Sequence, residues 1–297
     1  MLPYGWRGDF QEKRNLGKGR LIEKNLDDRV VKGFGEEWSR FDQSAMTDTD
    51  YRDAFAAYFN IFPWERLSTT AEGFDLGCGS GRWARGVAPR VGTLHCVDAS
   101  AAALRSAERL LADQSNVLFH CASVDSIPLG ENSMDFGYCL GVLHHVPDTE
   151  AGLCQAVAKL KQGAPFLLYL YYDFDNKPGW YRGIWKVTEI LRYVVSRSPF
   201  PVRHAVSDGL AAIVYLPLAR TALALEKIGW NVESFPLANY RNHGFYVMRT
   251  DALDRFGTRL EKRFSREEIQ AMMHRAGLRE IRFSPNPPYW CAVGFKA

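Results

Sequence analysis

A glycine-rich turn between two apolar segments constrains this chain more than any other feature. Residues 74–82 read Phe-Asp-Leu-Gly-Cys-Gly-Ser-Gly-Arg, and the next apolar run ends at Asp98. Alternating glycines after a strand let the backbone turn sharply, so that a ligand can contact bare peptide N–H groups and the start of the following helix. Asp98 lies 19 residues after Gly79, where a carboxylate at the end of the second strand can accept hydrogen bonds from both ribose hydroxyls. The turn therefore predicts a site for a nucleotide-like cofactor.

The same residues leave a second interpretation open. Gly79 to Ala84 also satisfy the G-x-G-x-x-A pattern of dinucleotide-binding enzymes, which would make the chain a nicotinamide-dependent oxidoreductase. Asp75 favours a different ligand, because its carboxylate would face an anionic pyrophosphate in such an enzyme. A negative group at this point suits a cationic amine.

Further motifs follow the turn in a set order. They are Ser123-Val124, Ile127-Pro128-Leu129, Ser133 to Phe136, and Leu140 to Asp148. With the glycine turn, these segments resemble the class I S-adenosylmethionine-dependent methyltransferases, and their order and spacing resemble the ubiquinone/menaquinone-biosynthesis-type branch. The resemblance covers residues 70–172 by specific motifs and 264–297 by pattern only. It implies methyl transfer with S-adenosyl-L-methionine as cofactor and S-adenosyl-L-homocysteine as product.

The resemblance also implies which residues surround the cofactor. At the methionine end of the cofactor they are Gly77, Cys78, Gly79 and Gly81, with Asp75 beside the amine. At the ribose they are Asp98 and Ala99, and at the adenine edge they are Ser123 and Val124. Leu140 is a further expected cofactor contact. Ser123 stands where an aspartate is common in the family. Arg82 is expected either to pair with the cofactor carboxylate or to be solvated. Trp38 is expected either to close over the sulfonium by a cation–π contact or to pack in the core.

Catalysis requires few residues, because methyl transfer from a sulfonium is an in-line displacement in which the protein aligns the acceptor and excludes water. A hydroxyl acceptor benefits from a base of near-neutral pKa, a task that suits histidine. His144 and His145 follow the fourth predicted strand at the cofactor-facing edge of the sheet, so one of them is expected to act as the base or to position the acceptor; the alternative is that they order the loop. Asp173 and His243 are further catalytic candidates.

Positive charge gathers in one segment of the chain. Residues 177–263 hold 14 Lys/Arg and 7 Asp/Glu, whereas the whole chain has a net charge of +3. The excess predicts contact with an acidic substrate or an anionic surface, or otherwise a solvated helix face. Arg241 and Arg249 are the residues expected to hold an anionic group of the substrate. Phe41 is expected either to close over the sulfonium together with Trp38, where it would contact the substrate, or to pack in the core.

The periodicity of the chain predicts an α/β fold. Strands are expected at 72–76, 93–98, 117–122, 134–140, 165–172, 278–284 and 290–296, with helices between most of them. Such alternation implies a mostly parallel sheet with helices on both faces and ligands at the carboxyl ends of its strands. In the Rossmann-like, seven-stranded fold that the resemblance implies, the last two strands form an antiparallel closing hairpin. The segment Asn286 to Tyr289 between them is interpreted as a turn, with a role in substrate binding as the less favoured alternative.

Three parts are expected along the chain: an N-terminal helical cap at 1–67, the cofactor-binding core at 68–172 and 264–297, and an inserted helical lid or substrate subdomain at 173–263. In the lid, residues 180–195 are expected to place Tyr181, Ile184, Trp185, Thr188, Leu191 and Val195 on an inward apolar face and Arg182, Lys186, Glu189 and Arg192 on the other. Pro217 is expected to kink a second helix at 206–228.

Composition sets the remaining expectations. With 297 residues and 46% apolar content the chain can bury a full core. The uncharged apolar stretch 209–219 is shorter than the roughly 20 residues of a membrane-spanning helix, so we expect a cytoplasmic protein; docking of the basic lid helix on a membrane surface is a less favoured alternative. The six cysteines show no metal-ligand spacing, so we expect reduced, buried thiols and no metal.

These observations favour an enzyme that methylates a small hydrophobic or amphipathic molecule, which is anionic if the basic excess is functional, most simply on oxygen. An RNA or protein methyltransferase is the first alternative, although interleaved acids and the absence of a nucleic-acid module argue against nucleic acid. A non-catalytic cofactor-binding protein is the other alternative besides the oxidoreductase. The sequence gives no oligomeric state.

Overall fold

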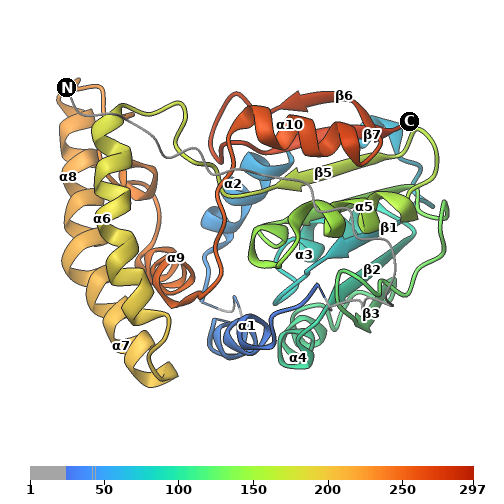
Figure 1. Cartoon of the computed structure of the whole chain (residues 1–297), viewed down its shortest axis with the longest axis horizontal. Helices are drawn as coiled ribbons and strands as arrows, with labels where there is room; N and C mark the ends of the chain where they lie inside the picture. The colour runs from blue at the N-terminus through green and yellow to red at the C-terminus, as the bar shows by residue number, and fades with distance from the viewer. Residues whose placement is uncertain (1–24, 42, 44) are drawn as a thin grey trace, which may run out of the picture.

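A seven-stranded sheet forms the centre of the molecule (Figure 1). The structure, a computed structural model, describes residues 25–41, 43 and 45–297, so the first 24 residues of the expected N-terminal cap lie outside the described part. The strand order is β3-β2-β1-β4-β5-β7-β6; β1 to β5 are parallel, and β7 runs antiparallel between β5 and β6. The strands are β1 Glu72–Leu76, β2 Thr93–Asp98, β3 Val117–Cys121, β4 Phe136–Leu140, β5 Pro165–Tyr169, β6 Leu278–Phe283 and β7 Ala292–Lys296. The predicted Rossmann-like fold with its closing hairpin is confirmed.

Glycines let β1 and β4 pack closely at the middle of this sheet. A Cβ atom on Gly73 would lie 2.3 Å from the ring of Phe136, and one on Gly137 would lie 2.5 Å from the ring of Phe74. Each phenyl ring therefore occupies the space that a side chain on the neighbouring strand would need. Both rings are completely buried, so these four residues fix the centre of the core from which the two strands run to the cleft.

Helices cover both faces of the sheet. On one face, α5 (Thr149–Lys159) and α10 (Arg266–Arg275) bury residues such as Leu153 and Met273. On the other, α2 (Asp48–Phe59), α3 (Ala84–Val87) and α4 (Ala101–Leu110) bury Phe59, Val87 and Leu104. The helix α1 (Asp28–Arg40) crosses the carboxyl edge of the sheet and contacts α4. Short 3₁₀ turns lie at Trp64–Arg66, Ala88–Arg90, Leu143–His145 and Ala238–Tyr240.

The chain leaves the sheet after β5 and returns to it at almost the same point. The Phe264 N–H donates to the Tyr171 carbonyl oxygen at 2.9 Å, and the Asp173 N–H donates to the Phe264 carbonyl oxygen at 3.1 Å. Between these contacts lie four helices, which we call the lid: α6 Gly179–Val195, α7 Phe200–Leu210, α8 Leu216–Lys227 and α9 Phe245–Gly257. Figure 1 shows α6, α7 and α8 at the end of the molecule away from the sheet, with α9 between them and α1.

The lid helix that contains Pro217 continues through the proline. One π-helical turn, Ala211–Tyr215, joins α7 to α8 and directly precedes Pro217. Proline has no N–H to donate to the preceding turn, and a wider π turn is one way for a helix to accommodate that loss. By length and composition alone, this run, Phe200–Lys227, is apolar enough to cross a membrane, which the scattered charges of the sequence concealed.

The orientation of α6 differs from the prediction. Glu189 and Arg192, expected on the outer face, point inward: Glu189 accepts from Arg255 of α9 at 2.6 Å, and Arg192 donates to the Thr258 carbonyl oxygen at 3.0 Å. Leu191, expected inside, is exposed. The other residues expected on the inner face lie there: Tyr181, Ile184, Trp185 and Thr188 line the cleft under the lid, and Val195 is buried. Ion pairs with α9 satisfy the inner charges, so α6 turns much of its apolar surface outward.

The cysteines also differ in part. All six are free, and four are buried as expected, but Cys121 and Cys154 are exposed. Within the described ranges no group of three or more metal-ligating side chains comes together.

Candidate cofactor and acceptor site

A cleft of about 1020 Å³ lies between the carboxyl ends of the parallel strands, α1, α2 and the lid. It is the place where ligands bind in open α/β sheets. Ten of the twelve residues expected to hold the cofactor line it: Trp38, Gly77, Cys78, Gly79, Arg82, Asp98, Ala99, Ser123, Val124 and Leu140. The lid closes the other side of the cleft with residues such as Trp185, Tyr215 and Tyr240.

Backbone hydrogen bonds hold the glycine turn at the bottom of the cleft. The Gly77 and Cys78 N–H groups both donate to the Val97 carbonyl oxygen, at 2.7 and 3.1 Å. Gly77 and Gly79 have φ angles of +79° and +55°, a region that other residues enter only at a cost. The turn is therefore set in place by β2 before any ligand arrives.

Asp98 binds this turn directly. Its carboxylate accepts the Gly79 N–H at 2.9 Å through Oδ2 and the Ser100 N–H at 2.8 Å through Oδ1. Burial raises the pKa of Asp98, and these two backbone donors act against that rise. Each carboxylate oxygen can accept more than one hydrogen bond, so the side chain can still receive two hydroxyl groups from the cleft.

Trp38 covers the turn from α1. A Cβ atom on Gly79 would lie 3.0 Å from the indole Nε1 of Trp38, so the ring rests against bare backbone. The helix itself lies close to the cleft because Gly35 meets Ser100, where a Cβ atom would come within 2.6 Å of the serine oxygen. An aromatic face at this position is able to attract a cation.

The far end of the cleft shows how the sequence departs from the family pattern. Ser123 and Val124 line it there. The Ser123 hydroxyl donates to the carboxylate of Asp125, which also accepts the Asn25 N–H at 3.0 Å. The carboxylate expected at position 123 therefore stands two residues later, and a serine hydroxyl faces the cleft instead.

Two of the expected cofactor residues lie outside the cleft. Asp75 is 1% exposed and lies beneath the turn beside Tyr138, and burial raises its pKa to about 8. Gly81 packs against α4, where a Cβ atom would lie 3.0 Å from Leu111. The positions of these two residues therefore do not support direct contact with the cofactor: Asp75 is a buried core group beneath the turn, and Gly81 permits a helix to pack.

Of the two adjacent histidines, only His145 lines the cleft. Its Nδ1 donates to the Leu260 carbonyl oxygen at 2.6 Å, and its Nε2 lies 3.9 Å from Oδ1 of Asp254. Burial lowers the pKa of His145 to about 4, so the ring is neutral at pH 7. His144 is completely buried and stacks on Tyr171 at 3.9 Å between ring centroids, so its position does not support the predicted catalytic role.

Of the two remaining catalytic candidates, His243 and Asp173, only one lines the cleft. His243 lines the cleft, and its Nδ1 lies 3.2 Å from Oδ1 of Asp50. Asp173 is not part of the cleft wall; it lies where the lid leaves the sheet. Its predicted catalytic role is therefore not supported by its position.

The expected substrate residues are mostly engaged elsewhere. Phe41 is buried between His204 and Tyr246, with ring centroids at 5.9 and 5.5 Å. Arg249 forms a two-pronged ion pair with Asp208 at 2.8 and 2.9 Å, away from the cleft. Neither position supports the predicted contact with the substrate. Arg241 does line the cleft, although its guanidinium is paired with Glu226 at 2.8 and 2.9 Å.

Sequence reasoning missed a cluster of acids on the lid side of the cleft. Asp251 and Asp254 of α9 and Glu37 of α1 all line it. Burial raises the pKa values of Asp251 and Asp254 to about 6 and raises that of Glu37. Nearby Arg82 acts against all three rises. Asp251 and Asp254 form only a D-x-x-D pattern in the sequence, which does not by itself indicate a site. The residues that make them a cluster, Glu37 of α1 and Tyr171 after β5, lie far away in the sequence.

Asp254 has the best-defined surroundings in this cluster. Its Oδ2 accepts a hydrogen bond from the Tyr171 hydroxyl just after β5. Its other oxygen has no hydrogen-bond donor among the described residues, and neither has the Nε2 of His145 opposite it. Two proton-accepting atoms therefore face each other at the wall of the cleft.

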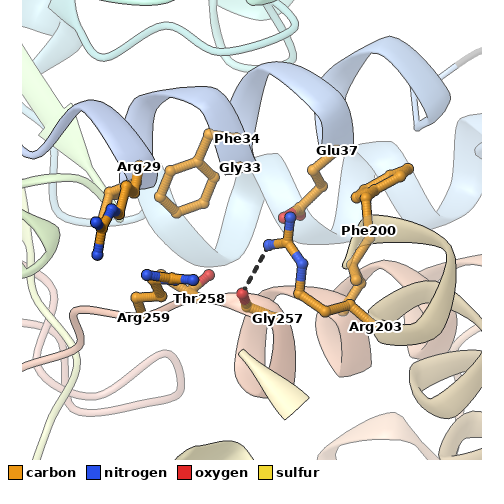
Figure 2. A pocket seen from close by; sticks show the side chains of 11 residues that line it. Arg29, Gly33, Phe34, Glu37, Phe200, Arg203, Gly257, Thr258 and Arg259 are labelled. Carbon is orange, nitrogen blue, oxygen red and sulfur yellow. Dashed lines mark hydrogen bonds between the residues drawn. The ribbon is translucent and has the colours of Figure 1, made fainter. Parts of the chain in front are cut away.

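Figure 2 shows a second, much smaller crevice on the other side of Glu37. Its volume of about 10 Å³ leaves room for about one water molecule. Arg203 closes it by donating to the Gly257 carbonyl oxygen at 3.0 Å and to Glu36 at 2.9 Å. Glu37 therefore lies between α7 and the main cleft, where Arg203 and Arg82 both lower its pKa against burial.

The segment Asn286 to Tyr289 makes the turn that was predicted, and it also lines the cleft. The Trp290 indole N–H fixes it by donating to Asp175 at 2.8 Å. The β6–β7 connection therefore contributes to the wall opposite α9, a role that the turn residues alone did not indicate.

The cleft fits S-adenosylmethionine. The glycine turn carries no side chain at the point where Trp38 lies against it. Asp98 can still accept hydrogen bonds from two hydroxyl groups. Arg82 lines the cleft at the start of the next helix, and no ion pair to it is found in the described part of the chain. Acids and aromatic rings around the methionine end suit a positive sulfonium. A pyrophosphate would face these acids unfavourably.

Comparisons with known proteins agree with this geometry. Residues 74–168 match the model of a methyltransferase domain. No curated protein matches the chain. Among solved structures, a protein of Haloferax volcanii assigned as a methyltransferase, in complex with the Trm112 methyltransferase activator, has 14% identity and a TM-score of 0.50 over 88% of this chain and 96% of its own. That likeness shows the fold.

Two further structures are similar at lower scores. An S-adenosylmethionine-dependent methyltransferase of Thermotoga maritima has 15% identity and a TM-score of 0.46 over 89% of this chain and 100% of its own. The N-methyltransferase NodS of Bradyrhizobium japonicum, in complex with S-adenosylhomocysteine, has 16% identity and a TM-score of 0.41 over 49% and 75%. Residues 74–168 are thus a methyltransferase domain, and the fit of the cleft agrees with an enzyme that uses S-adenosylmethionine.

Proposed function

We propose that the enzyme methylates a hydroxyl group of a small hydrophobic or amphipathic molecule, and that Asp254 receives the hydroxyl proton. The observation that carries the proposal is the position of Asp254 on the cleft wall, with one carboxylate oxygen held by Tyr171 and the other without a donor among the described residues. A pKa of about 6 makes this group a carboxylate at neutral pH and a better base than an exposed aspartate.

The size and lining of the cleft support a small acceptor. S-adenosylmethionine supplies the methyl group when bound at the glycine turn. The volume of about 1020 Å³ leaves room for a second molecule between the turn and the lid, where Trp185, Tyr215 and Leu218 present apolar surface. Trp38 and the lid exclude water from this region, so that the acceptor oxygen is less solvated and more reactive.

His145 positions Asp254 in this scheme. Its Nδ1–H is committed to the Leu260 carbonyl oxygen, which leaves a neutral Nε2 facing Asp254. Because the pKa of His145 is lowered to about 4, its ring is neutral at pH 7. It therefore does not neutralise the charge of the Asp254 carboxylate, and Asp254 remains the group that accepts the proton. The catalytic histidine of the sequence prediction thereby becomes a positioning residue.

An amine acceptor is the second candidate, because Glu37, Asp251 and Asp254 together would attract an alkylammonium group. The two acceptors differ in what Asp254 does. For a hydroxyl, Asp254 takes up the proton that leaves as the carbon–oxygen bond forms, and it therefore controls kcat. An alkylammonium binds through its charge and must first lose a proton to water so that its nitrogen has a lone pair to attack the methyl group; Asp254 then contributes binding and controls KM.

The test uses isotope-labelled S-adenosylmethionine, cell extract and purified enzyme, with the labelled product identified by mass spectrometry. We expect a small, apolar O-methylated product whose formation falls at least about 100-fold in Asp254→Asn through kcat, with S-adenosylhomocysteine affinity unchanged. Asp173→Asn is the matched control, because Asp173 lies outside the cleft, and it should retain activity. Label in RNA or protein alone, or an active Asp254→Asn enzyme, would contradict the proposal.

A further inference from the structure

The outer side of the lid is an apolar surface. On α6, Val187 and Ile190 are 69% and 71% exposed, and on the π turn Ile213 is 77% exposed. These side chains belong to one set, which we call the lid face: Trp180, Ile184, Val187, Ile190, Tyr193 and Val194 of α6 with Val202, Ile213 and Val214 of the α7–α8 run. Exposed apolar groups gathered on neighbouring helices mark an interaction surface more often than isolated ones do.

Packing fixes the direction of this face. The inner sides of the same helices are held against α9 by a buried cluster that contains Val195, Ala211, Tyr215 and Ala219. Residues two positions from these along a helix point about 200° away, so Ile213 lies opposite Ala211 and Tyr215. In Figure 1, α9 lies between these helices and the rest of the molecule, so their other side faces outward.

Charge complementarity identifies the partner. Between Pro178 and Trp230 the exposed charged side chains are five cations, Arg182, Lys186, Arg197, Arg220 and Lys227, and one acid, Glu226. That acid is paired with Arg241. Trp180, Tyr193 and Trp230 are exposed beside them, and such amphipathic rings favour the boundary between lipid headgroups and acyl chains. Apolar side chains with a cationic border suit an anionic bilayer.

The cleft reaches the lid face. Ile184 of α6 and Val214 of the π turn line the cleft and are also exposed, at 50% and 37%. The cleft wall and the lid face therefore share these two side chains, which places any opening from the cleft to the lid face between α6 and the π turn. A molecule dissolved in a bilayer would meet this opening without crossing water.

We infer that the lid face docks on an anionic lipid bilayer and that the amphipathic acceptor enters the cleft from the bilayer between α6 and the π turn. The part concerning the acceptor rests on the proposed function. The docking itself rests on the exposed apolar set and its cationic border alone.

The run Phe200–Lys227 lies on the bilayer in this arrangement and does not cross it. Arg203 and Asp208 on its inner side are paired with Glu36 of α1 and Arg249 of α9, at 2.9 and 2.8 Å. Crossing would strip these ion pairs from their partners and place both charges in hydrocarbon, which is far more costly than lying at the interface.

Vesicle co-sedimentation of the full chain tests the docking. We expect wild type to pellet with phosphatidylcholine vesicles that contain phosphatidylglycerol, and much less with phosphatidylcholine alone. The double variant Val187→Glu/Ile213→Glu should lose at least about tenfold in partitioning to both kinds of vesicle. The double variant Lys186→Gln/Lys227→Gln should lose about fivefold for each cation on the anionic vesicles only. Leu118→Glu, on the exposed edge strand β3, is the matched control and should pellet like wild type.

Two further measurements separate the explanations. Isothermal titration with S-adenosylhomocysteine should give the same affinity for every variant, which would show that each variant is folded. If the wild-type protein does not bind S-adenosylhomocysteine, the proposed function is overturned, and the vesicle experiment alone decides whether the lid face docks on a bilayer. Wild type that fails to pellet, or Glu variants that pellet as well as wild type, would overturn the docking. So would sedimentation analysis in which wild type is a dimer, the Glu variants are monomers and none binds vesicles, because the lid face would then join two copies of this chain.

Discussion

The indole nitrogen of Trp38 lies 3.0 Å from the point that a Cβ atom on Gly79 would occupy. A methyl group there would press on the ring as well as strain a backbone with φ of +55°. We predict that Gly79→Ala weakens S-adenosylhomocysteine binding about 100-fold, because strain and the displaced ring together cost about 3 kcal/mol. Gly141→Ala is the matched control: Gly141 also has a positive φ and lines the cleft, but a Cβ atom would meet nothing within 4 Å. Equal losses in the two variants, measured by calorimetry, would show that Trp38 plays no part.

Asp98 should be the largest single contributor to cofactor affinity. Replacement by alanine removes the acceptor for two ribose hydroxyls and for the Gly79 and Ser100 N–H groups. We expect at least about a 100-fold weaker affinity for S-adenosylhomocysteine, since hydrogen bonds to a charged group contribute about 1.5–3 kcal/mol each. Asp98→Asn should fall between wild type and alanine, because one oxygen remains. An alanine variant that binds like wild type would mean that the carboxylate only shapes the turn.

The pH dependence of the reaction should report Asp254. Its pKa of about 6 lies above the ordinary value of an aspartate because of burial, and only the carboxylate accepts a proton. We therefore expect kcat to be level above about pH 7 and to fall about tenfold per pH unit below pH 6. The residual activity of Asp254→Asn should lack this acidic limb. A limb that persists in the variant would assign the titration to another group, of which Asp251 is the first candidate.

Asp75 should make the protein less stable as the pH rises. Its folded pKa of about 8 exceeds the ordinary 3.8, so between these values the folded chain binds the proton and the unfolded chain does not. Stability from this group is full below about pH 4 and is lost as the pH rises toward 8, by about 1.4 kcal/mol per pH unit at most. Asp75→Asn should remove that slope, and the measurement is the difference in unfolding free energy between the two proteins across this range. A difference that does not change with pH would show that Asp75 is ionised in the folded chain.

Glu261 should be important for holding the lid. Its side chain is 1% exposed and pairs with Arg255 at 3.1 Å and Arg263 at 2.8 Å. Glu261→Gln leaves two guanidinium groups short of a counter-charge, and we expect a loss of about 3 kcal/mol in unfolding free energy. Glu150→Gln, which breaks the exposed pair with Arg275, is the control and should leave the melting temperature nearly unchanged. Similar losses in both would contradict the role of burial.

The sheet and the cofactor end of the cleft were predictable because their signals are local. The glycine turn needs positive φ angles, and Gly77 and Gly79 adopt them. A capping box begins α10: the Glu268 N–H donates to the Ser265 hydroxyl oxygen at 3.2 Å, and the Ser265 N–H donates to the Glu268 carboxylate at 2.8 Å. Each of these features depends on residues within a few positions of one another, so the sequence displays them directly.

The acceptor side of the cleft was not predictable in the same way. Asp254 gains its raised pKa from burial among segments far away in the sequence, and it faces Tyr171 and His145 only after the lid has folded. The inward face of α6 was misjudged because Glu189 finds Arg255, 66 residues away. Charges that meet inside a protein are indistinguishable in sequence from charges that meet water.

The hydrogen bonds that join Tyr171, Asp173 and Phe264 bring the two ends of the lid segment together at one edge of the sheet. A segment attached at a single point can be lengthened, shortened or exchanged for another without altering the register of any strand. If the lid contacts the acceptor as in the proposed function, evolution can replace that contact surface and keep the part that binds the methyl donor. Chimeric enzymes with new specificity should be spliced at this junction.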